Sequence, residues 1–304
     1  MPTASGPPPL PARSGAYRWL YADVQAGPVT VVCIFMLGAL FSPRYAVAAR
    51  RGAAPLDHTA VNCAVYRDGR RVAWAFTEWE GAEAGPVHLR IGRSTWCWTD
   101  GGVAITVDER TAPWGTPLRL SLRLHPDTDA GPAIALDARR RHHWQAAMPR
   151  ARARLTVPGL GLHADGLGYH DGNHGEEPLG GDLPGWTWAR VHGARRTTIA
   201  YHLPAPAHTI VVDAGSDGVT DARTPPAEPP QRRTRWGLAV PQRLAVGDRV
   251  LVPAHLLESS PFYARLEARG AASGGIAEVA DFRRFQQRRI RWMAYFRMRR
   301  ERAA

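Results

Sequence analysis

Lysine is absent from the 304 residues, so all 39 basic side chains are Arg, and they outnumber the 27 acidic ones. The sequence also lacks a long apolar run. Its longest, Val29 to Phe41, covers 13 residues, whereas a membrane-spanning helix needs about 20. The first fifteen residues contain no apolar core of a signal peptide. We therefore expect no transmembrane helix and no secretory leader, and we predict that residues 1–15 are a disordered Pro-rich tail.

Cysteine is scarce, and nucleotide-binding motifs are missing. Cys33, Cys63 and Cys97 stand about 30 residues apart without a C-x-x-C pair. This spacing favours neither a disulfide framework nor a zinc knuckle, so we expect reduced thiols in a cytoplasmic protein. The sequence contains neither a G-x-G-x-x-G fingerprint nor a Walker loop, which argues against a nucleotide-binding α/β fold.

The net charge of +12 is concentrated in one segment. Nine Arg and a single acid, Glu301, fall between Arg283 and Arg302, and the rest of the chain is nearly neutral. A nucleic-acid-binding protein usually spreads its basic residues over a binding face or carries a reading motif. The sequence has no zinc-finger spacing and no basic-region heptads. We therefore expect no nucleic-acid partner.

Hydropathy alternates with a period of two over most of the chain, as in half-buried strands. Clusters of Gly, Pro and Asp, such as Asp68-Gly69, separate the alternating segments at short intervals. This pattern is typical of an all-β barrel or sandwich. Strands are predicted at residues 29–35, 72–76, 103–107, 118–124, 152–157, 209–212 and 249–252.

The last segment follows a different period. Apolar residues recur every three or four positions from Val279 to Phe296, which predicts a C-terminal amphipathic helix. Most Arg side chains of this segment fall off the apolar stripe. Two interpretations stay open. The helix packs on a barrel with a solvated Arg face, or it also contacts an anionic membrane surface.

Residues 166–190 hold the densest set of polar and aromatic side chains. A metal site there would use His170 and His174, but Gly172 and Gly175 disfavour a helix that aligns the two imidazoles, and the H-E-x-x-H order is missing. We predict no metal. Nucleophilic catalysis is disfavoured as well, because the sequence has no G-x-S-x-G elbow.

A carboxylic acid among aromatic rings is the third candidate. Asp171 follows Tyr169 and precedes Trp186 and Trp188. Burial against such rings disfavours the carboxylate form, which raises the pKa and keeps the acid protonated. The π-faces of the rings can stabilise a cation, so the set suits the protonation of an alkene. The alternative is structural, with Asp171 in an Asx turn and the Trp side chains in the core.

Several motifs, spread from Tyr17 to Arg300, stand out along nearly the whole chain. They are Tyr17-Arg18-Trp19-x-Tyr21-x-Asp23, Phe41-Ser42-Pro43-x-Tyr45, Gly168-Tyr169-x-Asp171-x-Asn173-x-Gly175-x-Glu177-Pro178-Leu179, Trp186-x-Trp188, Ser260-Pro261-Phe262-Tyr263-x-Arg265 and the closing segment 285–300. Together they resemble the bacterial carotenoid 1,2-hydratases, also called hydroxyneurosporene synthases.

The resemblance implies a fold of two lipocalin-like β-barrel or sandwich domains, in agreement with the strand pattern. We place these domains at residues 16–160 and 161–304, the second including the basic terminal helix. The implied activity is that of a hydro-lyase without a cofactor. It adds water to the terminal C1=C2 double bond of an acyclic carotenoid, of the lycopene or neurosporene type.

The resemblance also implies the residues of the site, which are His142, Trp144, Tyr169 and Asp171. Asp171 would be the general acid, and Trp144 and Tyr169 would line the site of the carbocation. His142 would position the water or remove its proton. The expected substrate-binding residues are Asn173, Trp186 and Trp188.

Two other functions stay open at this point. The same barrels could carry a lipophilic ligand without transforming it, or they could shape a polyene for cyclisation. A pure carrier does not need an acid such as Asp171 deep in its pocket. For the hydratase we expect a cytoplasmic location, with possible peripheral attachment to the inner face of the cell membrane.

Overall fold

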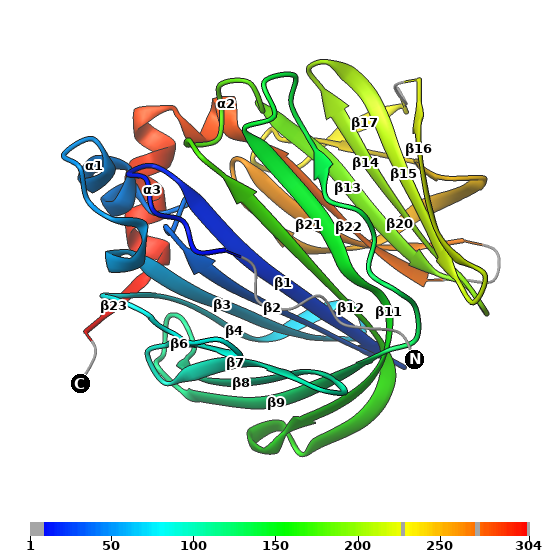
Figure 1. The fold of residues 1–304 in the computed structure, drawn as a ribbon, viewed down its shortest axis with the longest axis horizontal. Coiled ribbons are helices and arrows are strands. Elements are labelled where there is room, and N and C mark those ends of the chain that lie inside the picture. Colours follow the sequence, from blue (N-terminus) through cyan, green and yellow to red (C-terminus); the bar gives the residue numbers. More distant parts are fainter. Residues whose placement is uncertain (1–8, 226–228, 271–273, 303–304) are drawn as a thin grey trace.

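The computed structural model describes residues 9–225, 229–270 and 274–302, which form an all-β protein with short helices at one end (Figure 1). Residues 1–8 of the predicted Pro-rich tail lie outside the described residues, and residues 9–16 contain no helix or strand. No helix of the described part of the chain is long and apolar enough to cross a membrane.

The first sheet is antiparallel apart from its last strand, and its order is β23-β4-β3-β2-β1-β12-β11-β9-β8-β7-β6-β5, with β10 paired to β11. Its strands are β1 (Tyr17–Ala26), β2 (Val29–Leu37), β3 (Thr59–Arg67), β4 (Arg70–Trp79), β5 (Glu83–Ala84), β6 (His88–Ile91), β7 (Ser94–Thr99), β8 (Gly102–Arg110), β9 (Pro117–Pro126), β10 (Ile134–Ala135), β11 (His142–Val157), β12 (Leu162–Gly175) and β23 (Arg299–Glu301).

The second sheet has the order β16-β15-β14-β13-β22-β21-β20-β19, and β17 and β18 form a separate small pair. Its strands and the small pair are β13 (Gly185–His192), β14 (Thr197–Pro204), β15 (Ala207–Gly215), β16 (Gly218–Thr224), β17 (Gln231–Arg233), β18 (Ala239–Pro241), β19 (Leu244–Val246), β20 (Arg249–Ser259), β21 (Tyr263–Arg269) and β22 (Gly274–Asp281). Both sheets curl, and they lie beside each other in Figure 1.

All seven predicted strands lie within observed strands, namely β2, β4, β8, β9, β11, β15 and β20. The predicted turn at Asp68-Gly69 joins β3 to β4, and both residues have positive φ, 52° and 71°. A two-residue hairpin loop of the favoured kind needs this conformation at both positions, and Asp-Gly adopts it readily. The prediction of an all-β fold is confirmed.

Three neighbouring strands of the first sheet, β1, β2 and β3, are buried on both faces. In β1, Leu20, Ala22 and Val24 point into the core that the curled first sheet encloses, whereas Trp19 and Tyr21 point toward the second sheet. Successive strand residues face opposite sides, so a strand buried on both faces needs an apolar residue at nearly every position. This explains the apolar run of β2, in which Thr30 is the single polar residue.

The C-terminal helix is shorter than the sequence predicts. Val279 belongs to β22, where it pairs with Thr187 and Ala264. The helical part begins with α2 (Phe282–Phe285), whose N-terminus is capped by the Asp281 side chain, and continues after a break as α3 (Arg288–Arg297). A carboxylate that accepts from a free backbone N–H is a strong helix start, and this start overrides the apolar period upstream.

The helices gather at one end of the two sheets (Figure 1). There α1 (Pro43–Ala49) lies against α3, and a 3₁₀ turn occurs at Pro55–Asp57. A second 3₁₀ turn, Pro158–Leu160, joins β11 to β12 at the other end of these strands. After α3 the chain returns to the first sheet, where β23 pairs in parallel with β4. The C-terminal segment therefore joins the two sheets.

The chain passes from the first sheet to the second between Gly175, the last residue of β12, and Gly185, the first residue of β13. β12 pairs with β1 and β11 of the first sheet, and β13 is the next strand and lies in the second. The expected boundary near residue 160 precedes β12. We propose residues 176–184 as the boundary between the two domains, because this segment is the only connection between the sheets from β1 to β22 within the described residues.

Candidate active site

The candidate site lies on the face of β12 that is turned toward the second sheet. Tyr169, Asp171 and Asn173 occupy alternate positions of this strand, so their side chains share this face. Asp171 is opposite Tyr21 of β1, and Asn173 is opposite Trp144 of β11. Strand pairing thus brings residues from three segments of the chain to one place.

Three side chains bind the Asp171 carboxyl group. Trp144 Nε1 donates to Oδ2 at 2.9 Å, and the Tyr169 hydroxyl donates to the same oxygen at 2.8 Å. Asn173 Nδ2 donates to Oδ1 over a longer distance, 3.3 Å. Of the seven residues predicted for the site, four therefore meet through direct hydrogen bonds.

Burial raises the pKa of Asp171 from its usual 3.8 to about 8. The cause is desolvation of the carboxylate, and it outweighs the hydrogen bonds from Trp144 and Tyr169, which favour the charged form. Asp171 is therefore a neutral acid at pH 7. Because Oδ2 already accepts two hydrogen bonds, the proton belongs on Oδ1.

A small cavity of about 20 Å³ borders Asp171 between the two sheets. Its walls are Trp19, Tyr21, Asp171, Asn173, Trp186, Trp188, Tyr201 and Glu278. About 10–15 Å³ suffices for one water molecule, provided that two or more polar groups surround it. Asn173 Oδ1 and Trp188 Nε1 are buried here without a hydrogen-bond partner among the described residues, so the cavity suits a single water.

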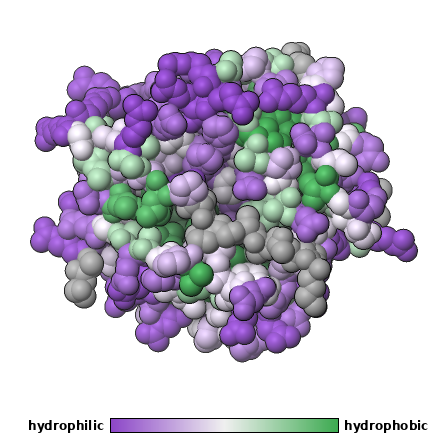
Figure 2. All heavy atoms as spheres, viewed as in Figure 1, coloured by the Kyte–Doolittle hydropathy of each residue, from purple (hydrophilic) through white to green (hydrophobic). Residues whose placement is uncertain are grey.

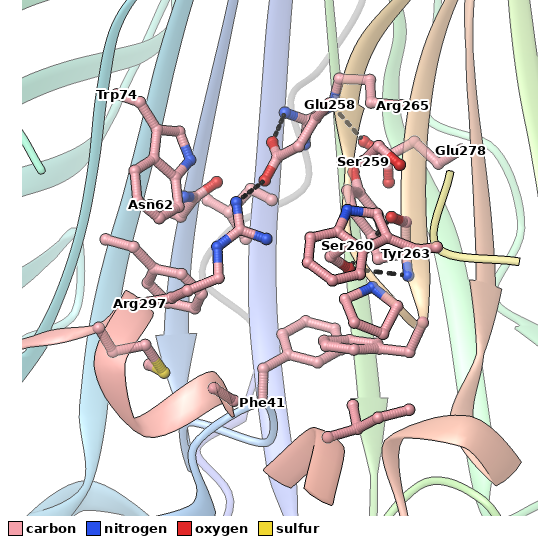
Figure 3. A pocket seen from close by; sticks show the side chains of 18 of the residues that line it. Phe41, Asn62, Trp74, Glu258, Ser259, Ser260, Tyr263, Arg265, Glu278 and Arg297 are labelled. Carbon is pink, nitrogen blue, oxygen red and sulfur yellow. Dashed lines mark hydrogen bonds and ion pairs between the residues drawn. The ribbon is translucent and has the colours of Figure 1, made fainter. Parts of the chain in front are cut away.

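A larger pocket of about 380 Å³ adjoins the small cavity, with Trp19, Tyr21, Trp186 and Glu278 in the walls of both. Aromatic, methionine and other apolar side chains make up most of its wall, and they include residues of both sheets and of α3. Figure 3 shows the polar side chains at one end of this pocket, where Arg265 binds both Glu258 and Glu278. The apolar walls suit a hydrocarbon chain, and the four shared residues separate this space from the small cavity.

The predicted Trp pair of β13 completes the aromatic wall. Trp188 lies 5.4 Å from the Tyr169 ring and 5.6 Å from the Tyr21 ring, centroid to centroid. Trp186 lies 5.8 Å from Trp19 in the same way. The structure thus places both Trp residues opposite β12, across the space between the sheets.

His142 lies on β11 opposite Gly175, four positions beyond Asp171 along β12. Its Nδ1 is 2.9 Å from the Tyr17 hydroxyl, and in the described part of the chain no hydrogen bond joins it to Asp171. The ring of Tyr17 stacks on Trp19, a wall of both cavities, at 5.2 Å. A Cβ on Gly175 would lie 2.5 Å from Tyr17 Cε1 and 2.6 Å from His142 Nδ1, so the contact requires glycine.

His170 and His174, the two histidines considered for a metal site, face away from Asp171 on β12. His170 binds the backbone oxygen of Tyr21 at 2.9 Å, and burial lowers its pKa to about 4. His174 stacks on His143 at 4.9 Å. Among the described residues, no group of three or more His, Cys, Asp or Glu side chains is arranged to hold a metal ion.

Sequence reasoning missed several walls of the site. Trp19 and Tyr21 belong to a motif that alternates aromatic residues along β1, and this alternation is a signal that they share one face. Tyr201 and Glu278 carry no such signal. Their strands reach the site only through the pairing of β13 with β14 and β22.

Two solved structures share the fold. An AttH-type protein from Nitrosomonas europaea superposes with a TM-score of 0.62 at 11% identity, over 87% of this chain and 92% of that one. CghA with Sch210972 superposes with a TM-score of 0.53 at 13% identity, over 92% and 94%. At these identities the likeness concerns the fold alone, and it agrees with the expected lipocalin-like architecture.

Sequence comparison gives the family. The acyclic carotenoid 1,2-hydratase of Thiocapsa roseopersicina is 33% identical over 299 residues, which cover 93% of this chain and 73% of the relative. That of Rubrivivax gelatinosus is 29% identical over 286 residues, which cover 88% and 68%. The sequence model of the carotenoid hydratase CrtC family matches residues 33–304. The resemblance found in the motifs is confirmed, and the chain belongs to the carotenoid hydratase CrtC family.

Proposed function

We propose that this protein is a hydro-lyase that adds water across the terminal C1=C2 double bond of an acyclic carotenoid. The observation that carries the proposal is a neutral carboxylic acid, Asp171, at the wall of a water-sized cavity beside an aromatic pocket. The names of the two relatives from Thiocapsa roseopersicina and Rubrivivax gelatinosus support the substrate class.

Asp171 is the general acid of the proposed reaction. Its Oδ1 proton goes to C2, the less substituted carbon, and leaves a tertiary cation at C1. The ring of Trp188, in the wall of the small cavity, presents π-electrons to this cation, and the rings of Tyr169 and Trp144 lie beside it around Asp171. The water of the small cavity adds to C1 and loses a proton. Oxidation levels of substrate and enzyme balance throughout, so the chemistry requires no redox cofactor.

The other predicted residues have supporting roles in this proposal. Trp144 and Tyr169 also fix the Asp171 carboxyl through Oδ2, so that Oδ1 carries the proton. Asn173 holds Oδ1 and borders the water, and Trp186 and Trp188 bind the end of the substrate. His142 acts through Tyr17, because its hydrogen bond fixes the ring that stacks on Trp19 in the wall of both cavities.

The rival functions would use the pocket differently. A carrier needs only the apolar walls, and a cyclase needs an acid but must keep water away from the cation. The small cavity next to Asp171 has buried polar groups, Asn173 Oδ1 and Trp188 Nε1, that suit a water molecule. This feature favours hydration over both.

Incubation with lycopene or neurosporene in ¹⁸O-labelled water tests the proposal. We expect one labelled hydroxyl at each reacted end, found by mass spectrometry. An isomer without the label would indicate a cyclase, and unchanged substrate that co-purifies with the protein would indicate a carrier. Asp171→Asn is the matched control, because an amide supplies no proton and should yield no product.

We further propose that the protein collects its substrate at an anionic membrane surface, on the cytoplasmic side. A carotenoid is nearly insoluble in water, and one wall of the large pocket is α3. The opposite face of α3 exposes Trp292 and Phe296, whose rings pair at 4.8 Å, next to the exposed Arg288 and Arg289. Aromatic and cationic side chains on one helix face are typical of binding to anionic bilayers.

A further inference from the structure

Glu278 occupies a central place between the two cavities. It lies on β22, directly opposite Trp188 of β13 and Arg265 of β21. Its side chain forms part of the wall of the small cavity that borders Asp171 and of the large pocket. A group in this position faces both the water and the end of a substrate in the pocket.

Arg265 holds the Glu278 carboxyl group in place. Arg265 Nε donates to Glu278 Oε1 at 2.9 Å, and the guanidinium is itself buried, with 1% of its side chain exposed. The same Arg donates to the Tyr66 hydroxyl at 2.9 Å and to Glu258 at 3.3 Å. Figure 3 shows both glutamates joined to Arg265. The ion pair with Arg265 therefore fixes the position of the Glu278 carboxyl group between the two cavities.

The charges around Glu278 come from both sheets. The titratable groups that interact with it are Tyr21 and Asp23 of β1, Asp171 of β12, Tyr201 of β14, and Tyr263 and Arg265 of β21. The negative charge of Glu278 adds to the desolvation that raises the pKa of Asp171. Glu278 thus helps to keep Asp171 protonated, and both carboxyl groups border the small cavity, as an acid and a base that act on one water molecule must.

We propose that Glu278 is the base that removes the proton from the attacking water. This inference rests on the proposed hydration. Asp171 loses its proton to C2, the water oxygen bonds to C1, and a proton of that water passes to Glu278. The product gains one water in total. The site is reset when the proton returns from Glu278 to Asp171 through the next water that enters the cavity.

The two nearest alternatives for this role are placed less well. His142 uses Nδ1 for the Tyr17 hydroxyl and is not in the wall of the small cavity. Glu258 binds the same Arg265 but lines only the large pocket. Glu258 therefore provides a matched control, since its replacement disturbs the same guanidinium without touching the water.

The test compares Glu278→Gln with Glu258→Gln in the full chain. For Glu278→Gln we expect kcat to fall about 10²-fold or more, as the loss of a general base usually causes, while the Kd for lycopene changes less than about threefold. The rate of the wild type should fall at low pH, where the base is protonated. This acidic limb should disappear in Glu278→Gln and persist in Glu258→Gln.

A second variant guards against a purely structural effect. Glu278→Ala enlarges the cavity, so added formate should enter and restore part of the rate. Formate should not restore Asp171→Asn, which lacks the acid. Two outcomes would overturn the assignment. One is an acidic limb that persists in Glu278→Gln, and the other is an equal loss of kcat in the two Gln variants together with no rescue of Glu278→Ala by formate. Failure of the hydration proposal itself shows separately, as absence of labelled product from the wild type.

Discussion

Chemistry and stability make opposite demands at Asp171. The folded protein raises the pKa of this carboxyl to about 8, whereas the unfolded chain leaves it near 3.8. A group with a raised pKa binds its proton more tightly in the folded state. Its contribution to stability is therefore complete below the unfolded pKa and is lost as the pH rises through the folded pKa. Neutral pH lies inside this window.

Asp171→Asn should therefore stabilise the fold while it abolishes activity. Asn remains uncharged, and its oxygen can still accept from Trp144 and Tyr169. We expect an increase in the free energy of unfolding of about 1–4 kcal/mol at pH 7, measured by urea denaturation. The difference should shrink to almost nothing near pH 4. A variant less stable than the wild type at pH 7 would contradict the raised pKa.

Gly175 allows a second test at the scale of single residues. In Gly175→Ala the new Cβ would meet Tyr17 and His142 at 2.5 and 2.6 Å, so the hydrogen bond between them should break. We expect a loss of kcat of about tenfold or more, since a displacement of about 1 Å near a reacting group costs up to 10²-fold.

Gly172→Ala is the control on the same strand, because the nearest heavy atom to its new Cβ is Trp19 O at 3.9 Å. Its kcat should stay close to that of the wild type. If both Ala variants lose activity equally, the contact of His142 with Tyr17 has no part in catalysis.

The predictability of the site differs from residue to residue. Tyr169, Asp171 and Asn173 alternate along one strand, so the sequence alone places them on one face. Trp186 and Trp188 carry the same signal on β13. Glu278 lies more than a hundred positions beyond Asp171, and only the pairing of β22 with β13 brings it to the cavity. No local pattern encodes such a contact.

At the scale of elements, a buried ion pair connects the two sheets. Asp23 of β1 accepts from Arg190 of β13, and both side chains are fully buried. Arg190 Nη1 also donates to Gln25 at 3.2 Å. Desolvation raises the pKa of Asp23, in spite of the attraction of Arg190. Removal of one partner leaves a buried charge without compensation, and this usually lowers the free energy of unfolding by roughly 3–5 kcal/mol.

Asp23→Ala should accordingly lower the free energy of unfolding by about 3–5 kcal/mol. The double variant Asp23→Leu with Arg190→Met replaces both charges by apolar groups and should recover most of this loss. Chemical denaturation of the single and double variants measures the coupling. A double variant as unstable as Asp23→Ala would show that the pair stabilises through its charges and not merely through occupancy of the space.

Elements were predictable where one pattern decided them. The strands with strict alternation, such as β8 and β9, appear as the sequence predicts. The sequence analysis placed the start of the C-terminal helix too early, at Val279. The reason is that β22 has apolar residues on both faces, and its last residues fit a helical period by chance. The cap at Asp281 was present in the sequence, and it marks the true start of α2.

At the scale of the whole molecule, the site belongs to neither sheet alone. The acid lies on the first sheet, the Trp pair and Glu278 lie on the second, and α3 closes the pocket between them. Hydrophilic side chains cover most of the face seen in Figure 2, and hydrophobic ones gather in separate patches between them. The resemblance of the sequence motifs implied two lipocalin-like domains, but the orientation of the two sheets depends on contacts between strands that are distant in the sequence.

Several Arg side chains of the basic C-terminal segment have structural contacts in the folded protein. Arg284 donates to the backbone oxygens of Pro261 and Trp236, and Arg297 lies in the wall of the large pocket. These residues hold the structure, so their replacement is a poor test of membrane attachment. Trp292 and Phe296 are 64% and 73% exposed on α3, and they offer a surface whose removal leaves the pocket wall unchanged.

Membrane attachment should depend on this aromatic pair and on its Arg neighbours. The double variant Trp292→Ser with Phe296→Ser should bind liposomes of anionic lipid at least about tenfold more weakly, because each aromatic side chain that enters the bilayer contributes about 1.5–3 kcal/mol and about 1.4 kcal/mol is a factor of ten. Replacement of Arg288 and Arg289 by Gln should weaken binding chiefly at low salt, since charges are screened over about 10 Å at 0.1 M.

Trp114→Ser is the control, because Trp114 is 87% exposed on the loop between β8 and β9. Sedimentation with liposomes measures the binding, and hydration of lycopene dispersed in detergent shows that the variants stay active. Equal binding by the double variant and the wild type would mean that α3 only closes the pocket and that the carotenoid is delivered by another route.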